Sequence, residues 1–268
     1  MFQVETKGTR KVSLLKIPSG EDIIVGRLYV AEGEERKATI LLLHGFPGVI
    51  LNLDIATTLQ EKGWNVLVIN YRGSWGSQGN YSFSNAIEDV QAALKYIRQE
   101  EVAQEYRIDL GRIGLVGHSF GGFLALKTAT LDPSIQVVAS LSGANFSLFI
   151  NMIKENPEME ARIIHMLEES AFFLKESTGE KLLQEVREHE DEWNTFLFAP
   201  TLANRKLLIT AVSNDEELPK EYFHDPFVQI LEESGVQFES VLFDTDHNYL
   251  NKRTELTNTI HDWLVKNL

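Results

Sequence analysis

Short apolar runs of strand length alternate with helical patterns along most of the chain. The runs are rich in aliphatic and β-branched residues, and from the third run onward the segments between them carry apolar residues at helical spacing. This alternation is typical of βαβ units and predicts an α/β fold with a mostly parallel sheet. The eight expected strands are Lys11–Ile17, Ile23–Val30, Ala38–Leu43, Asn65–Asn70, Arg112–Gly117, Gln136–Leu141, Arg205–Val212 and Val236–Phe243.

The first two runs predict a hairpin at one end of the sheet. Only Pro18-Ser19-Gly20-Glu21-Asp22 separates them, and these residue types favour a tight turn. We therefore expect an antiparallel pair of strands before the parallel part of the sheet begins.

Two long segments have an apolar stripe at helical spacing, Ser84–Gln104 and Asn248–Leu268. Together with the shorter run Phe123–Leu131 they predict helices that cover both faces of the sheet. The expected buried stripes are Ile87, Val90, Ala93, Leu94 and Ile97 in the first, and Leu250, Leu256, Ile260 and Leu264 in the second.

Residues 145–200 interrupt the alternation, because they show helical spacing but no strand pattern. We interpret the chain as a single domain, residues 1–268, with a helical cap at 145–200 inserted between the sixth and seventh strands. The cap holds twelve Asp and Glu against five Lys and Arg. A solvated acidic outer face explains this charge most simply, and attraction of an amine-bearing substrate is the alternative.

Composition excludes several functional classes. The 268 residues are 43% hydrophobic, enough for a packed core, and the net charge of −14 disfavours nucleic acid and anionic membrane surfaces as partners. No apolar run approaches the length of a membrane span, and the first residues do not resemble a signal peptide, so we expect a cytoplasmic protein. Without cysteine, and without metal-ligand or phosphate-loop spacing, we expect no metal and no cofactor.

The strongest chemical signal is Gly117-His118-Ser119-Phe120-Gly121-Gly122, which lies between an expected strand and an expected helix. In that context the G-x-S-x-G pattern predicts a nucleophile elbow, a sharp strand-to-helix turn that presents the serine hydroxyl. Glycines are needed there because side chains would collide with the neighbouring backbone. Ser119 is therefore the candidate nucleophile, and an ordinary helix cap is the alternative role.

A serine nucleophile needs a base and an acid that holds the base, and in this fold they follow the serine in the order acid, histidine. Asp215 follows the seventh expected strand and His247 follows the eighth, so both lie where strand ends meet. We interpret His247 as the base and Asp215 as the acid. The nearby carboxylates Glu216, Asp244 and Asp246 are rivals for the second role.

The loop after the third strand, His44-Gly45-Phe46-Pro47-Gly48, is the expected source of an oxyanion donor. Pro47 has no N–H and Gly45 suits the turn itself, which leaves the backbone N–H of Phe46. The second expected donor is the N–H of Phe120, directly after the nucleophile.

Four further polar residues flank these positions. We expect His44 and His118 to pack or form local hydrogen bonds rather than to react. Arg72 and Asp89 are interpreted as a structural ion pair behind the site, with a substrate clamp as the alternative.

These motifs resemble the α/β-hydrolase superfamily over nearly the whole chain. Asn70-Tyr71-Arg72-Gly73-Ser74, with Gly76, Gly79 and Asp89, is similar to the prolyl-oligopeptidase and serine-aminopeptidase branch and its related small esterases. The resemblance implies a Ser119–Asp215–His247 triad, but it does not determine the substrate.

The sequence thus favours a serine hydrolase, most simply a carboxylesterase that cleaves small or medium esters, with Phe146 of the cap contacting the substrate. An exo-acting peptidase or amidase would use the same residues, and a non-catalytic receptor on the same fold is a third hypothesis. The expected partner is a small ester or acyl substrate. The sequence leaves a homodimer open.

Overall fold

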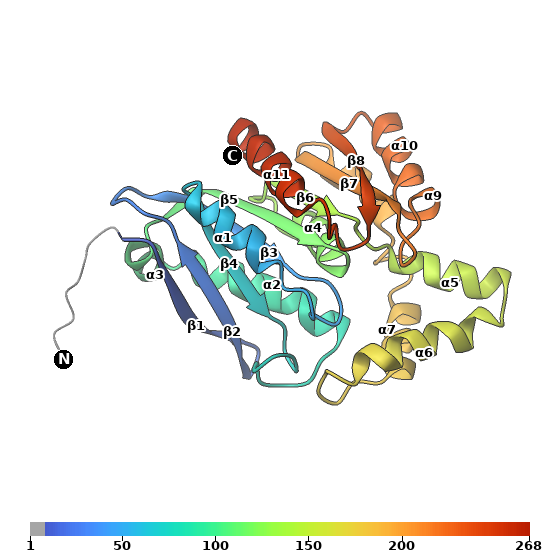
Figure 1. Ribbon diagram of the computed structural model, residues 1–268. Coiled ribbons are helices and arrows are strands. Elements are labelled where there is room, and N and C mark those ends of the chain that lie inside the picture. Colours follow the sequence, from blue (N-terminus) through green and yellow to red (C-terminus); the bar gives the residue numbers. More distant parts are fainter. Residues whose placement is uncertain (1–8) are drawn as a thin grey trace.

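The fold is built on one sheet of eight strands in the order β1-β2-β4-β3-β5-β6-β7-β8 (Figure 1). A computed structural model describes residues 9–268 of the chain. The predicted α/β class is confirmed, with a mostly parallel sheet and an antiparallel pair at its N-terminal edge. The second strand also runs antiparallel to β4. The strands are β1 Lys11–Ser19, β2 Asp22–Val30, β3 Lys37–Leu43, β4 Asn65–Asn70, β5 Ile108–His118, β6 Val137–Leu141, β7 Lys206–Asn214 and β8 Phe238–Asp246.

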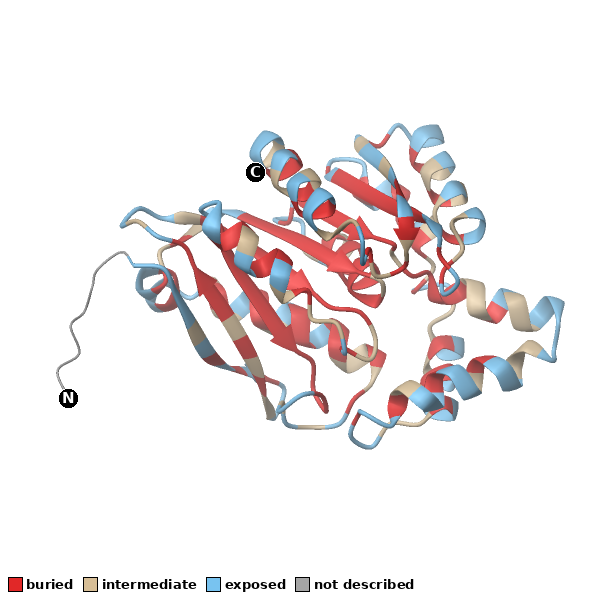
Figure 2. Ribbon diagram, in the orientation of Figure 1, coloured by how far each residue is buried: buried red, intermediate tan, exposed pale blue. Residues whose placement is uncertain are grey.

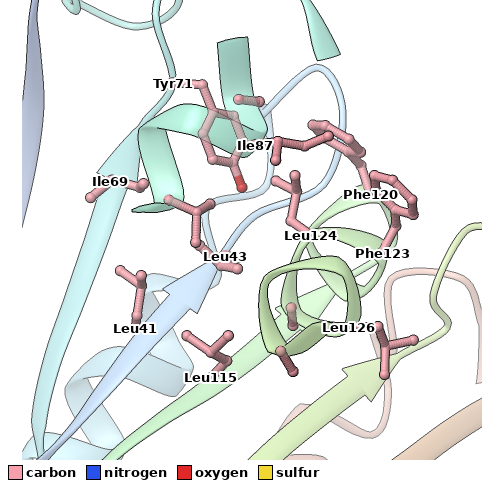
Figure 3. Packing of buried hydrophobic residues seen from close by; sticks show 14 of the residues in the cluster. Leu41, Leu43, Ile69, Tyr71, Ile87, Leu115, Phe120, Phe123, Leu124 and Leu126 are labelled. Atoms are coloured by element: carbon pink, nitrogen blue, oxygen red, sulfur yellow. The ribbon is translucent and has the colours of Figure 1, made fainter. Parts of the chain in front are cut away.

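The central strands are apolar on both faces, which is why the sequence shows continuous runs instead of strict alternation. In β3, Ile40 and Leu42 belong to one buried cluster, whereas Leu41 and Leu43 belong to the cluster on the opposite face. Figure 3 shows Leu41 and Leu43 beside Leu115 of β5 and the apolar residues of the helix that follows it. Both faces therefore require a covering layer of helices.

Two helical layers supply that cover. The helices α1 and α11 bury their apolar stripes against one face, and α2, α3, α4 and α10 bury theirs against the other. Figure 2 shows buried residues concentrated in the sheet and on the inner sides of these helices. The helices outside the cap are α1 Leu53–Glu61, α2 Phe83–Ile97, α3 Glu100–Glu105, α4 Phe120–Leu131, α9 Lys220–Phe223, α10 Asp225–Glu233 and α11 Arg253–Asn267.

One predicted helix is wrong in its extent, because Ser84–Gln104 forms α2 and α3 instead of one helix. Gln99 has an extended backbone with φ −65° and ψ 132°, which ends the helical course after Arg98. Arg98 lies at this turn, and its guanidinium donates a 2.5 Å hydrogen bond to the carboxylate of Asp132. The break lets the short second helix bury Val102 against the same core.

The last helix begins five residues later than predicted, at Arg253 instead of Asn248. The Asp246 carboxylate accepts hydrogen bonds from the N–H groups of Asn248 and Leu250, and this holds the segment as a turn. Leu250 consequently points outward and is 67% exposed, contrary to its expected place in the buried stripe. No helix among residues 9–268 is long and apolar enough to cross a membrane.

The segment between β6 and β7 is helical, and it extends beside the carboxyl ends of the strands (Figure 1). We call residues 145–200 the cap. The outer sides of α5 and α6 are largely exposed (Figure 2). Its helices are α5 Phe146–Glu155, α6 Met159–Ala171, α7 Gly179–Glu188 and the 3₁₀ helix η1 Thr195–Leu197, and α8 Ala199–Leu202 begins at the end of the cap and leads to β7.

The cap is fastened to the core through the loop that follows β4. The N–H of Tyr81 donates to the carbonyl of Lys175 at 3.0 Å, and the N–H of Lys175 donates to the carbonyl of Gly73 at 2.9 Å. The Glu185 carboxylate of α7 accepts 2.8 Å hydrogen bonds from the N–H groups of Phe83 and Ser84 at the start of α2. A cap carboxylate thus satisfies the N-terminus of a core helix, where negative charge is favoured.

The same loop is held from behind by a buried ion pair. The carboxylate of Asp89, on α2, accepts 2.7 Å and 2.6 Å hydrogen bonds from the side chain and the backbone N–H of Arg72. A third hydrogen bond comes from the Ser19 hydroxyl at 2.6 Å. Burial raises the pKa of Asp89, and these partners oppose that shift. Arg72 and Asp89 thus form the expected structural pair.

Removing the buried partner of Arg72 should cost far more stability than removing its exposed partner. Asp89→Ala leaves a buried guanidinium without its main counter-charge and should lower the free energy of unfolding by about 3–5 kcal/mol. Glu88 binds the same guanidinium at 2.6 Å but is 64% exposed, so Glu88→Ala should cost no more than about 1 kcal/mol. Urea denaturation of both variants measures the difference, and equal losses would contradict a structural role for the buried pair.

Candidate active site

Ser119 is the single residue between the end of β5 and the start of α4. Its backbone has φ 58° and ψ −119°, in a region that non-glycine residues rarely adopt. The N–H of Ser119 donates to the carbonyl of Leu141 on β6 at 2.9 Å, and its carbonyl accepts from the N–H of Ala144 at 3.1 Å. Neighbouring backbone therefore holds a conformation that costs about 1–3 kcal/mol.

Two glycines make this turn possible. A Cβ at Gly117 would lie 1.9 Å from the carbonyl oxygen of Gly121, and a Cβ at Gly121 would lie 2.1 Å from the carbonyl oxygen of Leu43. Three backbone segments meet here with no room for a side chain. The glycines of the motif are thus required by contact between β3, β5 and α4.

His247 and Asp215 come together at the ends of β8 and β7. Nδ1 of His247 lies 2.8 Å from Oδ2 of Asp215, and the two side chains are 5% and 2% exposed. The other carboxylate oxygen of Asp215 accepts from the N–H groups of Glu217 and Leu218. Because a carboxylate accepts, Nδ1 carries the proton and Nε2 of His247 is left with its lone pair.

The rival carboxylates make other contacts. Oδ1 of Asp244 binds the side chains of Ser213 and Asn214, and Oδ1 of Asp246 binds backbone N–H groups in the turn before α11. Glu216 is exposed. Asp215 is therefore the one of these four that holds the His247 ring.

Ser119 and His247 are not hydrogen-bonded to each other in this structure. Both line one chamber, but the Ser119 hydroxyl makes no hydrogen bond to any described residue. Nε2 of His247 is buried and likewise lacks a partner within residues 9–268. Catalytic hydrogen bonds are often loose without substrate, so the roles of Ser119, Asp215 and His247 stay predictions supported by their placement.

A second hydrogen-bonded group of serine, histidine and aspartate lies outside this site. His224 binds the hydroxyl of Ser240 at 3.1 Å and the carboxylate of Asp225 at 2.9 Å. Ser240 lies within the edge strand β8, where it is exposed, and it does not stand at a strand-to-helix turn. Hydrogen bonds among these three residue types do not by themselves make a nucleophile.

The expected oxyanion loop passes beside Ser119. A Cβ at Gly45 would lie 3.0 Å from Cβ of Ser119, so the loop can approach this closely because residue 45 is glycine. The hydroxyl of Tyr71 donates to the carbonyl of His44, and the indole N–H of Trp75 donates to the carbonyl of Pro47. These bonds fix the loop and leave the Phe46 N–H as its predicted donor.

Phe120 is the other predicted donor. It is the first residue of α4, so its N–H has no acceptor within the helix, and it lies at the positive end of the helix dipole. Phe46 and Phe120 both border the apolar pocket beside Ser119. Their oxyanion role stays a prediction.

Two hollows meet at Ser119. The larger, of about 450 Å³, is lined by His247, His118, Glu169, Glu217 and the loop around Gly45; we call it the histidine chamber. The smaller, of about 100 Å³, is lined mainly by aromatic and aliphatic side chains, with Glu217 and Ser170 also at its border; we call it the aromatic pocket. Phe46, Phe83, Phe120, Phe146, Phe149 and Leu167 are among the residues that form the aromatic pocket.

The two flanking histidines, His44 and His118, make hydrogen bonds to backbone carbonyls. Burial lowers the pKa of His44 to about 4 and that of His118 to about 3, with His247 opposing the charge of His118 as a second cause. Neutral His118 donates from Nε2 to the carbonyl of His247 at 2.8 Å. It therefore fixes the backbone that carries the predicted base.

Sequence comparison finds a matching family model and a longer relative. Residues 50–171 match the family described as BD-FAE. Acylamino-acid-releasing enzyme 1 of Oryza sativa subsp. japonica is 26% identical over 267 residues, which are 90% of this chain and 32% of that enzyme. The chain thus spans 32% of the length of this relative.

Structural comparison agrees on the fold. The Est1E protein of Butyrivibrio proteoclasticus, solved with ferulic acid bound, matches 94% of this chain and 98% of its own with a TM-score of 0.69 at 16% identity. The Pyrococcus furiosus esterase Pf2001 matches 96% of this chain and 91% of its own with a TM-score of 0.69 at 15% identity. The chain has the α/β-hydrolase fold. The resemblance expected from its motifs is confirmed.

Sequence reasoning missed residues on the open side of the site. Oε2 of Glu217 lies 3.6 Å from Nε2 of His247, and Glu169 and Met166 border the same chamber from the cap. The position of Glu217, two residues after Asp215, was the available signal. Phe146 does border the aromatic pocket, and Phe149 joins it there. Their contact with substrate stays a prediction.

Alanine should be tolerated at one glycine of β5 and not at another. Gly117→Ala places its methyl against backbone and should abolish folding or cost more than about 4 kcal/mol. Gly111→Ala on the same strand meets its nearest atom, an Asp109 side-chain oxygen, at 3.5 Å, so it should be tolerated. Thermal unfolding of the purified variants compares them, and a stable Gly117→Ala protein would show that the elbow is not tightly packed.

Stability should fall as the pH drops below about 6.5, the ordinary pKa of histidine. Because the folded pKa values of His44 and His118 are about 4 and about 3, only the unfolded chain binds these protons in that window. Each histidine should contribute a slope of about 1.4 kcal/mol per pH unit. Urea unfolding between about pH 6 and about pH 4.5 measures it. His118→Gln, whose amide can still donate, should remove one histidine's share of the slope, and an unchanged slope would refute the assignment.

Proposed function

We propose that this α/β-hydrolase is a serine carboxylesterase that cleaves small or medium esters through an acyl-enzyme on Ser119. The observation that carries the proposal is the buried Asp215–His247 hydrogen bond, which leaves Nε2 of His247 free in the chamber that Ser119 also borders. An imidazole oriented in this way can accept a proton from a serine hydroxyl.

In the proposed mechanism, Nε2 of His247 accepts the Ser119 proton while Oγ bonds to the ester carbonyl carbon. The N–H groups of Phe46 and Phe120 stabilise the negative oxygen of the tetrahedral intermediate, each by about 3 kcal/mol. The ester C–O bond then breaks, and the alcohol leaves with the proton that His247 returns. Water repeats the same steps on the acyl-enzyme and releases the acid.

The aromatic pocket supports an apolar acyl group. Phe83, Phe120 and Phe146 pack against one another at its wall, with ring centroids 4.5–5.5 Å apart. A flat or short acyl chain fits about 100 Å³ better than a long one does. The structural neighbour solved with ferulic acid, an aromatic acid, supports the same size class.

A peptidase of acylated amino acids is the second candidate function. It is favoured by the rice relative, named an acylamino-acid-releasing enzyme, which aligns with 90% of this chain. The same three residues would perform the reaction, and an amine would leave in place of an alcohol.

Turnover of matched substrates tests the proposal. Ser119→Ala should lower kcat/KM for nitrophenyl esters of graded acyl length by about 10⁴-fold or more, because the nucleophile is lost. Ser240→Ala is the matched control, since it removes a serine that is bonded to a histidine outside the site and should change kcat/KM by less than about twofold. The assay follows nitrophenolate release.

Acylaminoacyl arylamides are measured beside the esters. Esters that are cleaved faster by several orders of magnitude support the carboxylesterase. Arylamides that compete with esters favour the peptidase. Near-normal ester turnover by Ser119→Ala would refute the acyl-enzyme on this residue.

A further inference from the structure

The two hollows beside Ser119 differ in their contact with the predicted base. His247 borders the histidine chamber and not the aromatic pocket. Because the base must return its proton to the departing alcohol, the alcohol has to lie within reach of Nε2. The histidine chamber is therefore the leaving-group side, and the aromatic pocket is the acyl side.

The histidine chamber carries negative charge from two directions. Glu217 comes from the loop after β7, and Glu169 comes from α6 of the cap. No lysine or arginine is among the described residues that line the chamber. Each carboxylate has an oxygen 3.6 Å from a histidine nitrogen, Glu217 from Nε2 of His247 and Glu169 from Nε2 of the exposed His165, and a neutral imidazole does not neutralise it.

The chamber is also bordered by a buried polar atom that lacks a hydrogen-bond partner among the described residues. Nε2 of His247 has no hydrogen-bond partner in the described part of the chain, although the side chain is only 5% exposed. A ligand in the chamber would place its oxygen near Nε2 and its remaining atoms near the two carboxylates. A positive charge on those atoms gains from both, whereas a carboxylate there is repelled by both.

We propose that Glu169 and Glu217 select esters whose alcohol part carries a positively charged group such as an ammonium. The proposal rests on the proposed function, because it assigns the leaving group of that same reaction. It gives a role to part of the acidic charge of the cap, and it makes Glu217 a specificity residue of the leaving-group side.

The selection is tested by comparing kcat/KM for two substrates whose leaving groups have the same shape, one charged and one neutral. The probes are a thiocholine ester and the thioester of 3,3-dimethylbutanethiol, in which carbon replaces the choline nitrogen. Both carry the acyl group that ranks first among the nitrophenyl esters. In the wild-type protein kcat/KM should favour the cation by about tenfold, and added salt should reduce that ratio.

Neutral variants locate the effect. Glu169→Gln with Glu217→Gln should bring the ratio of cationic to neutral thioester close to one. Glu216→Gln is the matched control, because it neutralises an exposed carboxylate of the same loop that does not border the chamber, and it should keep the wild-type ratio.

The outcomes separate this inference from the function on which it rests. If the nitrophenyl ester is cleaved through Ser119 but the wild-type ratio is near one, the selection is wrong. A tenfold ratio that survives the double substitution overturns the role of the two glutamates. Faster cleavage of the neutral thioester than of the thiocholine ester overturns the choice of charge. If no ester is cleaved through Ser119, the proposed function fails and the inference falls with it.

Discussion

The backbone contact of β3, β5 and α4 is the constraint on which the site depends. Ser119 keeps its left-handed conformation because Gly117 and Gly121 allow three chain segments to touch where any side chain would collide. The strain is local, and the sheet that opposes it is apolar on both faces, so relaxation of the turn would disturb both buried clusters. The position of the serine is thus maintained by the whole core.

Buried histidines with different partners share this site without sharing a role. Asp215 gives His247 an acceptor for its Nδ1 proton, whereas His44 and His118 have carbonyl partners and, among residues 9–268, no carboxylate within hydrogen-bond distance. Desolvation then keeps those two neutral, so they add no positive charge beside the base. The neighbouring carboxylate, rather than burial, distinguishes the predicted base from its neighbours.

The strands and the elbow could be predicted because each corresponds to a pattern of neighbouring residues in the sequence. Apolar runs, glycine spacing and the order serine, acid, histidine are local patterns, and they placed Ser119, Asp215 and His247 at strand ends. The turn at Gln99 and the approach of Glu217 to His247 involve contacts between distant segments, and the outward Leu250 follows from hydrogen bonds of the Asp246 side chain to the backbone. Such contacts leave no periodic signal in the chain, so they required the structure.

The contacts between the cap and the core show which residues would have to be exchanged together to transfer the cap to another protein. The inserted residues exchange backbone hydrogen bonds with Gly73 and Tyr81, and Glu185 caps the start of α2. Trp75 of the same loop also stacks on Phe173 of the cap, with ring centroids 6.1 Å apart. A chimaera that exchanges residues 145–200 alone would therefore lose partners on both sides of the junction. The transferable unit is discontinuous and includes the loop between β4 and α2.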